Sequence, residues 1–352
     1  MKILAAIDGS FQSEAAIDAL GSFKWTTGTE IILFTVLKAP DMGLAFGKKS
    51  GDQTQILKDM AASTAETLKG MASDLEKTLP GSRVTFQIAQ GEAKGEILDA
   101  AKANAVDMII MGSRGHKGME LILLGSVSQG VLMQAQCPVV IVKSEASADA
   151  PNLQEGFKNV LLTVDNSPYS RAALAWVKTL KWSASTRFKL VTVVQPLTDS
   201  FASEESAVRA TSLTRQHDSL HAMARTELEA MAQDLIESVG PGRVTTQVGE
   251  GDPRELILHV AASWSADLIV MGSHGRTGLT KLLLGSVSHA VAVHGYCSVA
   301  IVKGVVPKGQ GAKQQQTGMF KVPEAKEIND RLPPPAPNSP SDTPHIQPGG
   351  MM

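Results

Sequence analysis

The sequence predicts an α/β protein of two tandem doubly wound domains, each a five-stranded parallel sheet with helices on both faces. Two observations predict this fold. The chain of 352 residues contains an internal duplication, and within each copy short apolar runs alternate with longer amphipathic stretches. This alternation is typical of βαβ units, whose right-handed crossovers bury a parallel sheet between layers of helices.

The duplication is visible in three pairs of matching segments that occur in the same order in both halves. They are MKILAAIDGS (1–10) with FKNVLLTVDNS (157–167), RVTFQIAQGEAKGEIL (83–98) with RVTTQVGEGDPRELIL (243–258), and VDMIIMGSRGHKGMELILLGSVS (106–128) with ADLIVMGSHGRTGLTKLLLGSVS (266–288). The offset is 157 between Asp8 and Asp165 and 160 between Gly112 and Gly272. Two long units in such close register indicate a duplicated domain rather than a solenoid.

The domain boundaries follow from this alignment and from shifts in composition. We expect domains at 1–144 and 157–303, a polar linker at 145–156 and a disordered tail at 304–352. Nine of the 17 prolines lie beyond residue 306, and this segment has too few apolar side chains to form a core. A proline-rich tail can dock on a protein partner, but PPPAP is a weak motif, and a solvated extension is the simpler expectation.

Five strands and four intervening helices are expected in the first copy. The strands are placed at 2–7, 30–36, 83–90, 107–111 and 138–143. The helices are placed at 12–24, 52–79, 94–104 and 126–135. The second helix is the longest, and its apolar residues recur at helical spacing until Pro80-Gly81 stops it. Those apolar residues are Ile56, Met60, Leu68, Met71, Leu75 and Leu79.

The second copy repeats the pattern. The apolar residues of its long helix are Leu220, Leu228, Met231, Leu235 and Val239. That helix is expected to stop at Gly240-Pro241-Gly242. Ser167 followed by Pro168, directly after the first strand of this copy, predicts a helix N-cap and a first helical position.

Composition excludes several classes of protein. A net charge of −2 and 4% aromatic residues argue against nucleic-acid binding. No run of 18 apolar residues is present and Asp8 interrupts the apolar start, so neither a membrane span nor a signal peptide is predicted. Cys137 and Cys297 occupy equivalent places and are expected to be small buried hydrophobic residues. We therefore expect a cytoplasmic, reduced protein.

A glycine-rich loop follows the fourth strand of each copy, and a helix is expected to begin at its last glycine-serine pair. The loop residues are Gly112, Gly115, Gly125 and Ser126 in the first copy and Gly272, Gly275, Gly285 and Ser286 in the second. Ligands of open α/β sheets bind beyond the carboxyl ends of the strands. Glycine lets the backbone approach a phosphate closely, and a helix start offers free N–H groups and a positive dipole end. This pattern favours a polyphosphate ligand.

Two other phosphate-binding motifs do not fit. The loop reads G-x-x-G-x-x-G at Gly112, Gly115 and Gly118, which differs from the G-x-G-x-x-G of dinucleotide-binding folds. It also lacks the second glycine of a P-loop, because Lys117 stands at that position. An empty strand-to-helix turn is the alternative, and an intact motif in both copies favours binding.

The spacing resembles the ATP-binding motif of the universal stress protein family, G-2x-G-9x-G-[ST]. The resemblance extends over nearly all of both predicted domains. It implies the strand order 3-2-1-4-5, with ATP, with or without Mg²⁺, across the tips of the first and fourth strands. It also implies that the fifth strands, PVVIVK and SVAIVK, pair to form an intramolecular pseudo-dimer.

The same resemblance implies roles for individual residues. Asp8 and Asp165 would contact the adenosine part, and Val36 and Val193 would meet adenine through their backbone. The glycines and serines of the two loops, named above, would hold ribose and phosphates. The second copy has Asn166 where the first has Gly9, and Thr35 and Thr192 replace a histidine common in the family.

Simpler structural roles compete with these assignments. Asp8 and Asp165 could be helix-capping residues at the ends of strands. The basic residues Arg114, Lys117 and Arg276 flank the loops and could neutralise phosphate, but they are equally consistent with a solvated surface.

The histidines of the long second-copy helix superficially resemble a zinc-protease motif. His217 and His221 lie four residues apart, but Asp218 replaces the glutamate base and the sequence indicates no third ligand. We therefore expect a polar helix face there and no metal site.

The sequence predicts an ATP-binding stress-response protein more than an enzyme. It lacks a G-x-S-x-G nucleophile elbow, and no acidic cluster beside the loops suggests a Mg²⁺ pair for rapid phosphoryl transfer. The alternatives are a slow ATP hydrolase or phosphotransferase, and a nucleotide-free scaffold that acts through a partner. A homodimer is a further expectation.

Overall fold

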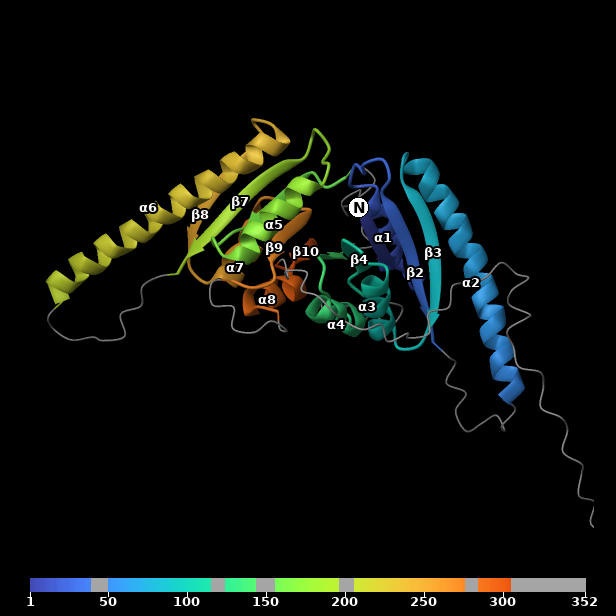
Figure 1. The fold of residues 1–352 in the computed structure, drawn as a ribbon. Coiled ribbons are helices and arrows are strands. Elements are labelled where there is room, and N and C mark those ends of the chain that lie inside the picture. Colours follow the sequence, from blue (N-terminus) through green and yellow to red (C-terminus); the bar gives the residue numbers. More distant parts are fainter. Residues whose placement is uncertain (39–49, 115–123, 144–155, 196–205, 276–283, 305–352) are drawn as a thin grey trace, which may run out of the picture. The chain divides into compact units, whose positions relative to one another are not determined.

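The computed structural model describes residues 1–38, 50–114, 124–143, 156–195, 206–275 and 284–304, all within one compact unit (Figure 1). In the two long helices the side chains are described from residues 55 and 215 onward. Gly115, Lys117, Gly118 and Arg276 of the loops lie outside the described residues, as do residues 145–155 of the linker and 305–352 of the tail.

The first domain alternates strands and helices as predicted. Its strands are β1 (Lys2–Ala6), β2 (Glu30–Leu37), β3 (Arg83–Gln90), β4 (Met108–Gly112) and β5 (Val139–Val142). Its helices are α1 (Phe11–Leu20), α2 (Ser50–Thr78), α3 (Ala93–Ala103) and α4 (Ser126–Gln134). The strands lie in the order β3-β2-β1-β4-β5, which confirms the predicted order 3-2-1-4-5.

The second domain has the same order, β8-β7-β6-β9-β10. Its strands are β6 (Asn159–Thr163), β7 (Arg187–Val194), β8 (Val244–Glu250), β9 (Leu268–Gly272) and β10 (Ser298–Val302). Its helices are α5 (Pro168–Thr179), α6 (Ser206–Val239), α7 (Pro253–Ser263) and α8 (Ser286–His294). Ser167 is the N-cap of α5 and accepts from the Ser170 N–H, as the Ser-Pro pair predicted.

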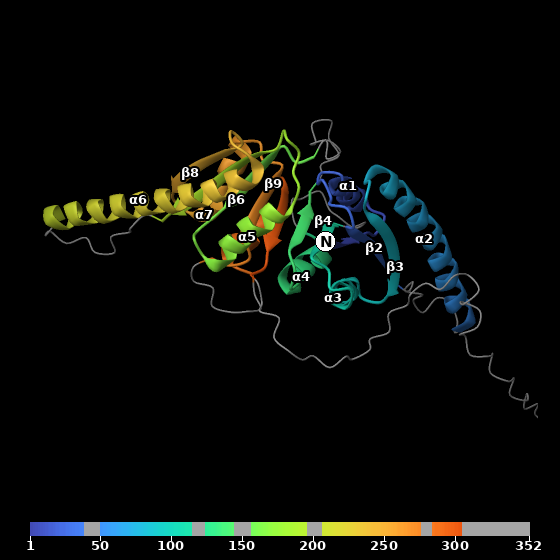
Figure 2. The same ribbon diagram turned by 45° about the horizontal axis from the view of Figure 1, so that its top comes forward.

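Alternate residues of the buried strands face two separate cores, which confirms helices on both faces of the sheet. In β1, Ile3 and Ala5 belong to the core under α1 and α2, whereas Leu4 and Ala6 belong to the core under α3 and α4. The second domain is arranged alike, with α5 and α6 on one face and α7 and α8 on the other. Figures 1 and 2 show α2 running beside β3 and α6 beside β8. Strands buried on both faces therefore read as continuous apolar runs.

The two sheets join into one ten-stranded sheet through their fifth strands. β5 and β10 pair antiparallel, with Val140 opposite Ala300. This pairing confirms the expected pseudo-dimer contact, and it satisfies two edges that would otherwise present open N–H and C=O groups.

An aromatic cluster forms a second contact between the domains. The ring of Phe23 lies 5.3 Å from that of Phe157 and 5.4 Å from that of Trp182. The Lys24 N–H donates to the Lys181 carbonyl oxygen at 2.9 Å. Because the chain leaves the helix to make these contacts, α1 ends at Leu20, four residues before the predicted end.

Candidate functional site

The predicted site residues gather at the carboxyl edge of each sheet, where the strand order reverses. Asp8 follows β1 and Gly112 ends β4, and these two strands are neighbours in the sheet. From this pair the strand order runs outward in opposite directions, to β2 and β3 on one side and to β5 on the other. Asp165 and Gly272 have the same positions at β6 and β9. In open α/β sheets, ligands bind at a reversal of this kind, beyond the carboxyl ends of the strands.

In the second domain the fold brings Asp165 directly against the glycine loop. A Cβ added at Gly275 would lie 2.8 Å from Asp165 Oδ2, closer than real side-chain contacts allow. Asp165 also accepts from the Ser167 N–H at 3.1 Å, which holds the carboxylate at the start of α5. Gly275 itself is exposed. Only glycine fits at position 275 beside this carboxylate without displacing it.

In the first domain Asp8 organises the start of α1. Its Oδ1 accepts from the Ser10 N–H at 3.0 Å and from the Ser10 hydroxyl at 2.6 Å. Ser10 is the N-cap of α1, and its hydroxyl lies 3.5 Å from the carbonyl oxygen of Arg114 at the base of the loop. The serines are therefore the capping residues, and the aspartates hold the capping turns in place.

The change from Gly9 to Asn166 preserves the backbone conformation. Gly9 has a φ of 78° and Asn166 a φ of 60°, both in the left-handed region. Asparagine is one of the few residues with a side chain that adopts this region readily. The turn after the first strand is therefore the same in both domains.

The first glycine of each loop is fixed by packing. A Cβ at Gly112 would lie 2.6 Å from the Gln12 carbonyl oxygen, and one at Gly272 would lie 2.6 Å from the Tyr169 carbonyl carbon. The first helix of each domain thus crosses the end of the fourth strand at backbone contact distance. These glycines allow the crossing that closes one side of the corner.

The last glycine of each loop is the N-cap of the following helix. Gly125 and Gly285 have extended backbones, and within the described residues no side chain caps α4 or α8. The N–H groups of Gly125 and Gly285 donate at 2.8 Å to the Ser113 and Ser273 carbonyl oxygens. Ser126 and Ser286, the first helical residues, are exposed. The arrangement leaves the positive end of each helix without a side-chain cap at the edge of the corner.

A second serine in each loop has a structural role that the sequence analysis missed. The Ser128 hydroxyl donates to the Gly112 carbonyl oxygen, and the Ser288 hydroxyl to the Gly272 carbonyl oxygen, both at 2.8 Å. Each bond fastens the start of a helix to the end of the fourth strand. The signal was present in the sequence, because G-S-V-S occurs in both copies.

The valines expected near adenine are accessible at the same edge. Val36 and Val193 are half-buried next to the ends of β2 and β7, beyond fully buried residues. Thr35 is buried, and its hydroxyl donates to the Ile7 carbonyl oxygen at 2.8 Å. The threonine that replaces the family's histidine therefore ties β2 to the end of β1.

The two corners differ in their aromatic surroundings. In the second domain His274 packs against Tyr169, with ring centroids 4.9 Å apart, and its Nδ1 lies 3.1 Å from the Ser273 hydroxyl. The corresponding residues of the first domain are Arg114 and Gln12. The second corner is consequently more apolar on this side.

The fold and these corners define the class: a duplicated, doubly wound α/β protein with a glycine-bearing loop at the switch point of each sheet. The chain belongs to the universal stress protein family. The family model of that description matches residues 1–143 and 156–303. No helix among the described residues combines the length and apolarity needed to cross a membrane.

Curated relatives and a solved structure agree with this membership. The chain is 34% identical over 189 residues to universal stress protein Rv2005c of Mycobacterium tuberculosis, a match that covers 54% of this chain and 59% of that relative. It is 26% identical over 310 residues to a universal stress protein of Mycolicibacterium smegmatis, covering 86% and 96% of the two chains. A universal stress protein structure from Archaeoglobus fulgidus has the same fold, with a TM-score of 0.57, 24% identity and coverage of 86% and 96%.

Proposed function

We propose that each domain binds an adenine nucleotide, with ATP as the ligand, in the crevice between its first and fourth strands. The observation that carries the proposal is the contact between Asp165 and Gly275. It places a carboxylate from the end of β6 beside a glycine of the loop after β9. The carboxylate can accept hydrogen bonds from ribose hydroxyls, while the bare backbone leaves room for phosphate.

The remaining residues complete one ligand outline in each domain. Val36 and Val193 would border adenine, and Asp8 and Asp165 would border the ribose. Gly115 and Gly275 would lie along the phosphates. The first turns of α4 and α8, beginning at Ser126 and Ser286, would supply N–H groups and the positive end of the helix dipole. Gly112 and Gly272 act indirectly in this proposal, by allowing the first helix to close the crevice.

The protein would act as a nucleotide-dependent stress-response regulator that binds more than it catalyses. Nucleotide bound at either site stabilises the folded chain by mass action, by about 2.7 kcal/mol per site at a ligand concentration 100 times Kd. The two corners are tied through one continuous sheet, so occupancy of either can alter a surface shared by the domains. A protein partner would bind to that surface and so respond to nucleotide occupancy.

The test is the thermal stability of the full-length protein with and without ATP. The melting temperature should rise with ATP, and the rise should be lost in the Gly115→Val, Gly275→Val double variant. Valine at 275 would strike the Asp165 carboxylate. Gly70→Val is the matched control, since a Cβ at Gly70 meets no described atom within 4 Å. A shift in the double variant equal to that of the control would reject these loops as the site.

Each single variant tests nucleotide binding by one domain at a time. Gly115→Val and Gly275→Val alone should each leave one bound nucleotide per chain, counted by native mass spectrometry. The same samples should show little ADP formation over hours. Steady ADP production that disappears with the loop substitutions would replace the binding proposal with a hydrolase.

A further inference from the structure

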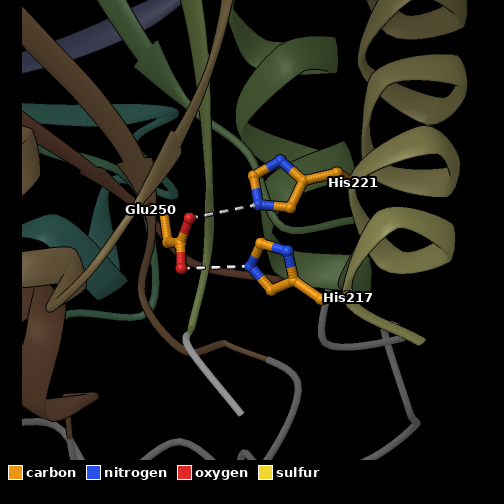
Figure 3. Close-up of side chains that lie close together, drawn as sticks. All are labelled: His217, His221 and Glu250. Carbon is orange, nitrogen blue, oxygen red and sulfur yellow. Dashed lines mark ion pairs between the residues drawn. The ribbon is translucent and has the colours of Figure 1, made fainter. Parts of the chain in front are cut away.

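Two histidines of α6 and the last residue of β8 converge on one point. His217 Nε2 lies 3.0 Å from Glu250 Oε1, and His221 Nε2 lies 3.6 Å from Glu250 Oε2 (Figure 3). The two imidazole rings lie 4.5 Å apart on successive turns of the helix. One ligand atom from each of the three residues lies within 4.8 Å of the other two.

The ring nitrogens that face Glu250 have an unusual environment. Both Nε2 atoms are shielded from solvent, although the side chains are 29% and 31% exposed. Within the described part of the chain neither Nε2 has a hydrogen-bond partner of acceptable geometry. Shielded polar atoms without such a partner are rare and require a physical explanation. A cation between the rings and the carboxylate would provide one, because nitrogen lone pairs and carboxylate oxygens would all be directed toward it.

The two nitrogen–oxygen separations, each to a different oxygen of Glu250, are close to those expected between ligands of one metal ion. Imidazole nitrogen and carboxylate oxygen each bind zinc at about 2.0–2.2 Å, so two ligands at a tetrahedral angle lie roughly 3.3 Å apart. The two nitrogen–oxygen separations, 3.0 and 3.6 Å, lie on either side of this value. With one oxygen of Glu250 bound, the three protein ligands leave a fourth tetrahedral position for water.

We propose that His217, His221 and Glu250 form a binding site for a divalent transition-metal ion of the zinc type. The donor set selects this chemistry, because imidazole binds zinc, cobalt, nickel and copper ions, whereas magnesium and calcium prefer oxygen ligands. Glu250 supplies the third ligand that the sequence did not indicate. It comes from a strand, 29 residues beyond His221.

The duplication provides an internal comparison. Aligning the long helices at an offset of 160 places Leu57 and Ala61 where the second domain has His217 and His221, and the third strands place Gln90 opposite Glu250. The first domain therefore has none of the three ligands. The nucleotide motif is present in both copies, whereas the three residues of this cluster occur in the second copy alone.

The position of the cluster gives the ion a structural effect. Glu250 is in register with Val194 of β7, and the Gly251 N–H donates to the Val194 carbonyl oxygen at 3.2 Å. A bound ion would connect the described part of α6 to the end of β8 with bonds to side chains on both elements. It would stabilise the edge of the sheet one residue from Val193.

The test uses the full-length protein, free of any histidine tag, with Zn²⁺ and Co²⁺ as probes. Calorimetric titration should show a Zn²⁺ site whose affinity falls about 100-fold or more in His217→Ala and in Glu250→Gln. Co²⁺ should give a visible absorption band of a low-coordinate site that both substitutions abolish. Glu250→Gln keeps the shape of a partly exposed side chain, so it tests the proposal even if His217→Ala fails to fold.

His259→Ala is the matched control, since His259 is an exposed histidine of the next helix in the chain, α7, on the other face of the sheet. It should bind Zn²⁺ and Co²⁺ as the wild type does. Wild-type protein with no Zn²⁺ site, or a site unchanged in affinity and cobalt spectrum by Glu250→Gln, would overturn the proposal and leave a histidine–carboxylate ion pair. Because the nucleotide residues are untouched, the result is independent of ATP binding.

Discussion

Lys303 Nζ donates a 2.7 Å hydrogen bond to the carbonyl oxygen of Leu132, in the last turn of α4 of the other domain. Lys143 makes the reciprocal contact, donating to the carbonyl oxygens of Val293 and Gly295 at the end of α8. Each lysine directly follows a junction strand, β5 or β10. The two domains therefore cap each other's helices with positive charges at the negative ends of the dipoles.

These lysines should make stability depend on pH. Burial lowers the pKa of both Lys143 and Lys303 from 10.5 to about 8. Between these values the unfolded state binds more protons than the folded state, so the lysines contribute more to stability as pH rises from about 8. Burial also raises the pKa of Cys137 to about 11 and of Cys297 to about 12, which opposes this effect above pH 9. Melting temperature should therefore increase between pH 7.5 and 9 and stop increasing above that.

The Lys143→Met, Lys303→Met double variant isolates the lysine contribution. Its melting temperature should lose the rise between pH 7.5 and 9, because methionine does not titrate. Identical pH profiles for variant and wild type would show that the two lysines are already charged without penalty in the folded protein.

Phe157→Ala should strongly destabilise the junction between the domains. The side chain is 1% exposed, and its ring packs edge-on against Phe23. Loss of a buried phenylalanine costs about 3–5 kcal/mol through lost burial and the cavity left behind. Denaturant unfolding followed by tryptophan fluorescence measures the change, and Phe11→Ala, at a position 48% exposed, is the control expected within about 0.5 kcal/mol of wild type. Equal effects would contradict the packing argument.

Gly272→Ala should destabilise the protein without any ligand present. The new methyl group would meet the Tyr169 backbone at 2.6 Å, and backbone cannot move aside as a flexible side chain can. Overpacking of this kind costs about 1–3 kcal/mol. Gly70→Ala, within α2, should instead stabilise by up to about 1 kcal/mol through helix propensity. Denaturation midpoints of the two variants should shift in opposite directions, and shifts of the same sign would be inconsistent with this account.

Substitutions of the two serines in a G-S-V-S segment should have different effects, one on stability and the other on ATP binding. Ser128→Ala removes the donor to the buried Gly112 carbonyl oxygen and should cost about 1–3 kcal/mol of unfolding free energy. Ser126 is exposed and is not in the buried hydrogen bond, so Ser126→Ala should change stability little and weaken ATP binding. Unfolding and ATP titration of both variants provide the comparison. A larger stability loss in Ser126→Ala would reverse the assignment.

Much of the fold could be predicted because its signals are local. Continuous apolar runs predict strands buried on both faces, and Pro80-Gly81 and Gly240-Pro241 mark helix ends close to where the helices stop. The exception is the end of α1, which contacts with Lys181 and the aromatic cluster decide. Cys297 is buried as expected, whereas Cys137 is half-buried, so the prediction for that cysteine was only partly right.

The sequence predicted which residues belong to the candidate site better than it predicted what each of them does there. Repeated spacing picks out Gly112, Gly125 and their counterparts, but spacing does not distinguish a glycine needed for phosphate from one needed for packing. Gly112 is an example of a glycine needed for packing, because its close neighbour is the Gln12 backbone, 100 residues earlier in the chain. The role of Ser128 was missed for the same reason.

The amino-acid sequence by itself determined the duplication, the order of strands and helices, and the loops at the carboxyl ends of the strands. These depend on periodicity, turn residues and repetition, which act over a few neighbouring residues. Only the tertiary structure decided that Asp165 lies against Gly275, that Lys143 and Lys303 cap helices of the opposite domain, and that Glu250 joins His217 and His221. Those contacts join side chains from elements far apart in the chain, and their positions are set by how strands pair and helices pack.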